Sequence, residues 1–354
     1  MTPAVRCRPQ AMSSVDWPLV SKVAAKTAGR YELEGTYHEE RFAEQAPGLV
    51  ERASGLVEDA TGLITRGQPV VSVVNRNQWV EANVASFSVL LAPAEDALQQ
   101  TTGLGSELAS RFVALEMGAV LGLLSRRVLG QYELVLPTAD GGVGDTVMFV
   151  GANILAMERQ QEFRPAEFRF WVALHECTHR AQFLGVPWLR EYFLSLVAEL
   201  VGSATPEPGR MQRVYSQLRT ASSAGEPMID ERGLFGLFAS PDQQGMIDRV
   251  QAMMSLLEGH GHVVMDDIGA RELVTQQRMS AVLKMRRRDP RTATFMRLIG
   301  LEMKLKQYEA GAKFIKGVER HAGWSALDAA WISPEHLPTL EEIDNPVSWL
   351  ERVQ

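Results

Sequence analysis

The chain has 354 residues, of which 45% are hydrophobic and 22% are charged. This balance is ordinary for a globular protein and leaves enough apolar surface for a large core. The formal net charge of -7 argues against a nucleic-acid partner, because nucleic-acid-binding surfaces are usually basic. No stretch approaches the roughly 18 apolar residues that a membrane span needs. We therefore expect no membrane span. Two cysteines cannot build a disulfide framework, so we expect a cytoplasmic protein.

The N-terminal residues are expected to lie outside the folded part. They include two arginines but no apolar run of the kind that a secretory signal needs. We interpret residues 1–14 as a disordered extension, ahead of a helix cap that leads into Trp17. The remainder shows no internal repeat and no long linker. Residues 15–354 are therefore predicted to form a single domain.

Helical periodicity dominates the first 130 residues. Apolar residues recur at helical spacing in four segments, which cover residues 15–27, 37–63, 79–92 and 107–130. Pro47, followed by Gly48, is expected to break the second segment. In the fourth segment Gly118 and Gly122 lie four residues apart, which would let another helix approach closely in the core.

Three short runs have the composition of β-strands. The first begins at Gln68, and the other two cover residues 132–137 and 146–151. The glycine-rich loop between the second and third runs lacks the Lys-Ser/Thr ending of a phosphate-binding loop, so we interpret it as a hairpin turn.

The second half of the chain is again mostly helical. Helices are predicted in segments that cover residues 165–184, 187–201, 244–269 and 294–320. Residues 202–246 are the least regular stretch, and the C-terminal tail mixes turns with a short helix. The fold class expected from the whole pattern is mainly α, with a small β-sheet or hairpin.

The segment VALHECTHRAQF, residues 172–183, carries the strongest chemical signal in the chain. His175 and His179 are four residues apart, so on a helix they point the same way and can offer two imidazole nitrogens to one ion. Glu176 is rotated by about 100° and would sit beside such an ion, where it could accept a proton from water. This HExxH spacing therefore predicts a zinc (Zn²⁺) site with a general base.

A third protein ligand is needed, and two glutamates compete for the role. A third histidine six residues after His179 is excluded, because that position is Gly185. Glu258 directly precedes a glycine, which resembles the third-ligand helix of several gluzincin aminopeptidases, where the glycine lets the helices pack closely. Glu199 lies in an amphipathic segment where surface glutamates are common. We favour Glu258 and keep Glu199 as the alternative.

Two further histidines lie close to Glu258 in the sequence. His262 is four residues after Glu258 and shares its helical face, so it could support a ligand or be one itself. His260 points elsewhere on the helix, where it could cap a neighbouring element or meet substrate.

Five segments of the chain together resemble the zincin-like metallopeptidase family of actinobacteria and related bacteria. They are FVGANI, FRFWVALHECTHRAQFLGVPWL, SLLEGHGHVVMD, GLEMKLKQYEAGAKFI and SPEHLPTLEEIDNPVSWLERV. The resemblance extends from about Val15 to Val353, and some family members are labelled as associated with deazaflavin coenzyme biosynthesis. It implies a helical zincin-like fold, a zinc site at His175 and His179, and Glu176 as the catalytic carboxylate. Many relatives have EGHAD where this chain has EGHGH, which leaves the role of His262 open.

Three other residues lie in stretches that resemble the family, and each has an alternative structural role. Asn153 could hold the end of a strand or orient substrate. Arg180 could pair with an acidic group in the core. Tyr308 could donate a hydrogen bond to an oxyanion in the transition state.

The expected activity is zinc-dependent hydrolysis of a peptide or small amide substrate. The alternative is a non-catalytic zinc-binding scaffold or regulator, associated with cofactor biosynthesis. The coordination shell distinguishes them, because an enzyme keeps an open position whereas a scaffold fills it with a fourth protein ligand such as His262.

Overall fold

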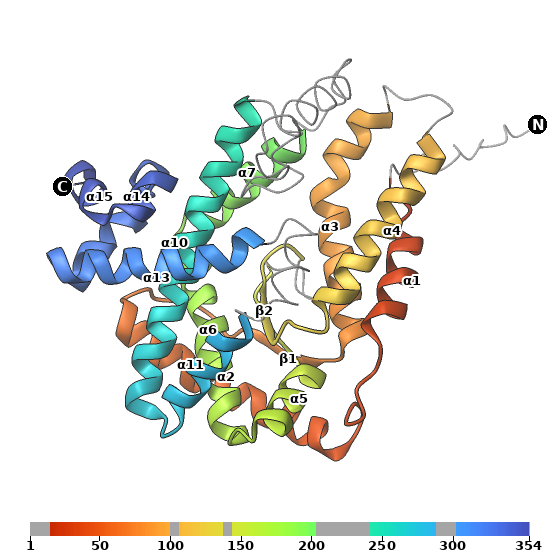
Figure 1. Cartoon of the computed structure of the whole chain (residues 1–354), viewed down its shortest axis with the longest axis horizontal. Coiled ribbons are helices and arrows are strands. Elements are labelled where there is room, and N and C mark those ends of the chain that lie inside the picture. The colour runs from red at the N-terminus through yellow and green to blue at the C-terminus, as the bar shows by residue number, and fades with distance from the viewer. Residues whose placement is uncertain (1–14, 100–105, 137–143, 203–240, 288–301, 354) are drawn as a thin grey trace, which may run out of the picture.

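A computed structural model describes residues 15–99, 106–136, 144–202, 241–287 and 302–353 (Figure 1). Three predicted features lie outside the described residues. They are the extension 1–14, most of the irregular stretch 202–246 and the start of the predicted helix at 294–301. The prediction of a mainly helical chain with a small sheet is confirmed. In the described residues no helix is long and apolar enough to cross a membrane.

The first helix of the chain packs against the fourth (Figure 1). Helix α1 (Trp17–Ala28) begins where the Asp16 carboxylate accepts the Leu19 N–H at 3.0 Å. Its partner is α4 (Ser106–Leu124). A methyl group on Gly118 would come within 2.7 Å of the Val20 carbonyl, and Gly122 is equally close to α1. The predicted close approach at these two glycines is confirmed.

Helix α2 (Tyr37–Thr61) continues through Pro47, so the predicted break there is wrong. Proline in a helix interior costs about 3 kcal/mol, because a backbone hydrogen bond is lost. The apolar stripe of α2 is buried on both sides of Pro47, with Phe42, Val50 and Val57 almost fully covered. Since each such side chain contributes about 1.5–3 kcal/mol on burial, the packed stripe outweighs the cost of the proline.

The three strands form one mixed sheet in the order β1-β3-β2. Strand β1 (Val70–Val74) runs parallel to β3 (Thr146–Val150), and β2 (Gly130–Glu133) runs antiparallel to β3. The expected hairpin of the second and third runs is therefore present, although β2 starts and ends earlier than predicted. Strand β2 ends at Glu133 because its carboxylate accepts the N–H groups of Val135 and Leu136, which turns the chain. Among the described strands, β2 is at the edge of the sheet.

The other described helices pack against the sheet or against one another. They are α3 (Arg76–Gln99), α5 (Gly151–Gln161), α6 (Pro165–Gly185), α7 (Leu189–Gly202), α10 (Pro241–Glu272), α11 (Gln276–Arg287), α13 (Glu302–Ala322), α14 (Leu340–Asp344) and α15 (Pro346–Val353), with 3-10 turns η1 (Trp324–Trp331) and η2 (Pro334–His336). Helix α6 is the most central, because it contacts α2, α10 and β2. In Figure 1, the group α1, α3 and α4 lies on one side of the sheet and the C-terminal helices α14 and α15 lie on the far side.

Helices α10 and α13 cross each other (Figure 1), and a pair of glycines lies at their contact. A methyl group on Gly259 would meet the backbone of Gly311 at 2.2 Å, and one on Gly311 would meet the Ser255 carbonyl oxygen at 1.8 Å. The close helix packing expected directly after Glu258 is thus confirmed. Because Glu258 directly precedes Gly259, the contact between α10 and α13 also fixes the position of Glu258.

Gly311→Ala is expected to lower the free energy of unfolding by about 1–3 kcal/mol or more, since the added methyl group forces two backbones apart. The matched control is Gly55→Ala on the exposed face of α2, where a methyl group meets nothing within 4 Å. That change should stabilise the protein by about 0.5–1 kcal/mol through helix propensity. Thermal unfolding of both variants checks the pair, and equal melting temperatures would contradict the tight crossing.

Candidate metal centre

Two histidines on α6 meet at their Nε2 atoms. The helix starts at Pro165 and is anchored by buried aromatic side chains, including Phe168 and Trp171. His175 and His179 follow one turn apart, and their Nε2 atoms lie 3.2 Å from each other. Their rings are nearly perpendicular, at 80°. Both imidazoles therefore aim one nitrogen at the same point.

Glu258 reaches this point from α10. Its Oε2 atom lies 3.6 Å from the Nε2 atom of His175 and 3.6 Å from that of His179. Among the described residues, the side chains of His175, His179 and Glu258 form a group that could hold a metal ion. Four ligands at about 2.0–2.1 Å around a tetrahedral zinc ion are about 3.4 Å apart. The observed separations fit that requirement with three ligands.

The surroundings of the group favour positive charge. Burial alone lowers the pKa of His179, but the hydrogen bond and the charge of Glu258, helped by Glu176 and Gln182, raise it to about 9. The Glu258 side chain is itself only 6% exposed. A carboxylate buried against two imidazoles stabilises a cation at this point, whether a proton or a metal ion supplies the charge.

Glu176 lies beside the two histidines and against the edge strand. It is buried, and a methyl group built on Gly130, the first residue of β2, would lie only 2.6 Å from its Oε1 atom. Strand β2 also contacts α6. The missing side chain at Gly130 therefore makes the space that the Glu176 carboxylate occupies.

Gly130→Ala is expected to reduce turnover at least about tenfold while zinc remains bound. The methyl group must displace the Glu176 carboxylate, and the general base that the sequence predicts at this position would then lose much of its 10²–10⁴-fold contribution. Gly245→Ala is the control, because a methyl group there meets nothing within 4 Å. Unchanged turnover in Gly130→Ala, measured at equal zinc content, would show that the position of Glu176 does not depend on this contact.

His260 points away from the group formed by His175, His179 and Glu258. It is buried, with its ring stacked at 5.7 Å on Trp324 and edge-on to Trp331 at 5.3 Å. Burial, with a smaller effect of His179, lowers its pKa to about 3, so the ring is neutral. Its Nδ1 atom lies 3.0 Å from the Gln182 amide nitrogen. Its contacts are thus with the protein interior, and a contact with substrate stays a prediction.

His262 is also buried, and one of its partners is Asp266, with 3.5 Å between Nε2 and Oδ2. Asp266 accepts hydrogen bonds from Gln276 and Ser280, which come from α11. His262 therefore lies at the contact of α10 with α11. Within the described part of the chain it does not join the group of His175, His179 and Glu258.

Glu199 is not part of the group. Its carboxylate lies 3.6 Å from the guanidinium of Arg249, and its side chain is 56% exposed. The geometry therefore favours Glu258 over Glu199 as a partner of the two histidines.

Asn153 and Tyr308 were the remaining candidates. The amide nitrogen of Asn153 donates to the carbonyls of Ser125 at 2.7 Å and Val128 at 2.6 Å, and its oxygen accepts from Arg76 at 2.8 Å. These bonds hold the chain just before β2, and a contact of Asn153 with substrate stays a prediction. Tyr308 falls within α13, but its side chain lies outside the described residues.

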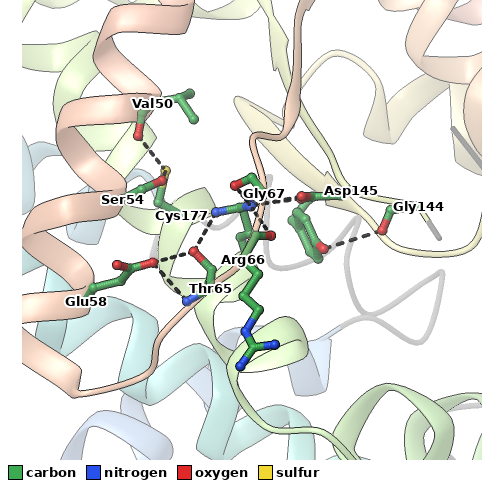
Figure 2. Close-up of polar contacts among 11 residues, drawn as sticks. Val50, Ser54, Glu58, Thr65, Arg66, Gly67, Gly144, Asp145 and Cys177 are labelled. Atoms are coloured by element: carbon green, nitrogen blue, oxygen red, sulfur yellow. Dashed lines mark hydrogen bonds and ion pairs between the residues drawn. The ribbon is translucent and has the colours of Figure 1, made fainter. Parts of the chain in front are cut away.

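Arg180 follows the second histidine and ties α6 to the segments just before β1 and β3, whose residues Thr65, Gly67 and Asp145 are labelled in Figure 2. Its guanidinium forms two hydrogen bonds to the Asp145 carboxylate, at 2.8 and 2.9 Å, just before β3. It also donates to Thr65 and to the Gly67 carbonyl, just before β1. Thr65 is held in turn by Glu58 of α2. The expected acidic partner in the core is therefore Asp145, and the network fixes the helix that carries the histidines.

A helical scaffold that brings an HExxH pair and a distant glutamate to one point defines the zincin class of metal centre. Residues 15–350 match the model of the family described as zincin-like metallopeptidase, and the chain belongs to that family. It is similar to a solved structure from Chloroflexus aurantiacus, described as "a putative hydrolase with a novel fold". The two are 29% identical with a TM-score of 0.71, over 96% of this chain and 98% of that chain. No curated protein matches the chain.

Two residues near the group were missed by the sequence analysis. Gly130 carries no chemical group, so only its contact with Glu176 shows its importance. Gln182 is three residues after His179 on the same helical face, and this spacing could have drawn attention to it. Its partners come from α10 and could not be known from the spacing.

Proposed function

We propose that the chain is a zinc-dependent hydrolase that cleaves an amide bond, with His175, His179 and Glu258 as the metal ligands. The observation that carries the proposal is the triangle of their ligand atoms, with sides of 3.2, 3.6 and 3.6 Å. Two imidazole nitrogens and one carboxylate form a ligand set that is typical of catalytic zinc. Membership of the zincin-like metallopeptidase family supports the same assignment.

The proposed reaction needs a base beside the metal, and Glu176 fits that role. Zinc, when bound, supplies Lewis-acid chemistry, which polarises a carbonyl and makes water more acidic. Glu176 takes the proton of the attacking water and afterwards gives it to the leaving nitrogen. The buried position of Glu176 beside His175 supports this role.

The proposed substrate is a peptide, with a small amide as the narrower alternative. Strand β2 is at the edge of the described sheet, and its first residue lies against Glu176. An edge strand offers unpaired backbone groups that an extended peptide can add to. The scissile bond of such a peptide would be held beside the base.

A non-catalytic scaffold linked to cofactor biosynthesis is the competing proposal. It requires a fourth protein ligand, and His262 was the candidate for it. One partner of His262 is Asp266, and the candidate group of His175, His179 and Glu258 does not include His262, which supports the hydrolase. A buried carboxylate at position 176 also has a use in a hydrolase and none in a closed structural site.

Peptide-library cleavage by the zinc-loaded protein tests the proposed function. We expect zinc-dependent cleavage that disappears when the metal is chelated and returns when zinc is added back. Absence of cleavage of any peptide or amide by fully zinc-loaded protein would contradict it.

A further inference from the structure

We propose that Gln182 is a positioning residue, which fixes the ring tautomer of His179 so that its Nε2 lone pair faces the metal. The inference rests on the proposed zinc-dependent function. Gln182 is fully buried on α6, between His179 and the helix α10 that carries Glu258. Its side chain contacts three groups, which are His179, His260 and the Leu257 carbonyl.

The Leu257 carbonyl determines which way the Gln182 amide points. A carbonyl oxygen can only accept, so the amide atom 3.0 Å from it must be the NH₂ group of Gln182. The opposite orientation would place two oxygens against each other in the protein interior, at the cost of a buried unsatisfied acceptor. The Oε1 atom of Gln182 therefore faces His179.

The orientation of the amide fixes the hydrogen on His179. The Nδ1 atom of His179 lies 2.9 Å from Oε1 of Gln182, and this oxygen can only accept. The hydrogen of the neutral ring is therefore on Nδ1. The Nε2 atom, which lies 3.2 Å from Nε2 of His175 and 3.6 Å from Glu258, keeps its lone pair for a cation.

His260 completes the arrangement on the other side of the amide. The second hydrogen of the Gln182 NH₂ group points to Nδ1 of His260 at 3.0 Å, so this nitrogen accepts and the ring hydrogen is on Nε2. The buried ring of His260 packs against Trp324 and Trp331, which hold it in this position. His260 therefore holds the amide that orients His179.

The same amide also aligns the two helices that supply the ligands. Leu257 directly precedes Glu258, so the hydrogen bond from Gln182 ties α6 to α10 at the third ligand. A ligand set held in place before the metal arrives loses less conformational freedom on binding. Gln182 is thus expected to affect zinc affinity without being a ligand.

The first test compares Gln182→Met with Gln276→Met in zinc affinity, measured by competition with a chelator. Methionine keeps a similar volume and removes every hydrogen bond of the glutamine. We expect Gln182→Met to lose about 10–100-fold in affinity, as outer partners of zinc histidines do. Gln276 is a buried glutamine of α11 whose amide donates to Asp266, so its change should lower thermal stability and leave zinc affinity unchanged.

The second test is the ¹⁵N NMR spectrum of selectively labelled histidines in the metal-free wild-type protein. We expect His260 as the neutral tautomer with its hydrogen on Nε2. A hydrogen on Nδ1 of His260 would show that the Gln182 amide is reversed, and the proposal would be wrong.

The outcomes separate the two proposals. If wild-type protein binds zinc and Gln182→Met binds it equally well, the positioning role is wrong and the metal site stands. If the wild-type protein binds no zinc, the proposed metal function is wrong and the role of Gln182 in it falls as well.

Discussion

Glu176→Gln is expected to lose turnover by at least about 10²–10⁴-fold while it binds zinc normally. Glutamine has the same shape as glutamate, so it fits the space beside Gly130 without a new clash. It cannot accept a proton, and general base catalysis contributes a factor of this size. The measurement is kcat on a cleaved peptide, with zinc content determined on the same sample.

A matched control is Glu191→Gln, which changes an exposed carboxylate on α7. It should leave turnover within experimental error of the wild type. Full activity in Glu176→Gln at full zinc occupancy would contradict the proposed mechanism. Loss of activity together with loss of zinc would instead mean that Glu176 supports the metal site and is not the base.

Glu258→Gln is expected to weaken zinc binding by more than about 100-fold. The change removes a negative charge that lies 3.6 Å from both histidine nitrogens, and it replaces a carboxylate ligand with a neutral amide. Outer partners of metal ligands alone are worth 10–100-fold, so loss of a direct ligand should cost more. Competition with a chelator of known affinity measures the effect.

The same change at the alternative glutamate is the control for this prediction. Glu199→Gln removes a carboxylate that is 56% exposed and paired with Arg249, so zinc affinity should not change. Reversed results, with a normal Glu258→Gln and a weakened Glu199→Gln, would show that the ligand set is different from the one proposed.

Much of the fold follows from periodicity in the sequence. Helical spacing predicted the helices that carry the chemistry, and the small residues Gly118, Gly122 and Gly259 marked close helix contacts that the structure contains. The break at Pro47 was wrong, because local propensity cannot show that the apolar stripe on either side of the proline is buried. The parallel pairing of β1 with β3 was not foreseen either, since the two strands lie more than 70 residues apart.

The candidate site likewise contains residues that local spacing predicts and residues that only tertiary contacts reveal. His175, Glu176 and His179 lie within one helical turn, so the spacing alone brings their side chains to one place. The choice between Glu258 and Glu199 depended on a tertiary contact, and only the glycine after Glu258 hinted at it. Gln182 and Gly130 act through partners that are distant in the sequence, which are Leu257 for the one and Glu176 for the other.

A crystal structure of the zinc-loaded protein, with anomalous diffraction at the zinc edge, tests the account most directly. We expect one strong peak bound by His175 Nε2, His179 Nε2 and the Glu258 carboxylate, with a water molecule beside Glu176 in the fourth position. A peak elsewhere in the molecule, or a fourth protein side chain in place of water, would contradict the proposed hydrolase.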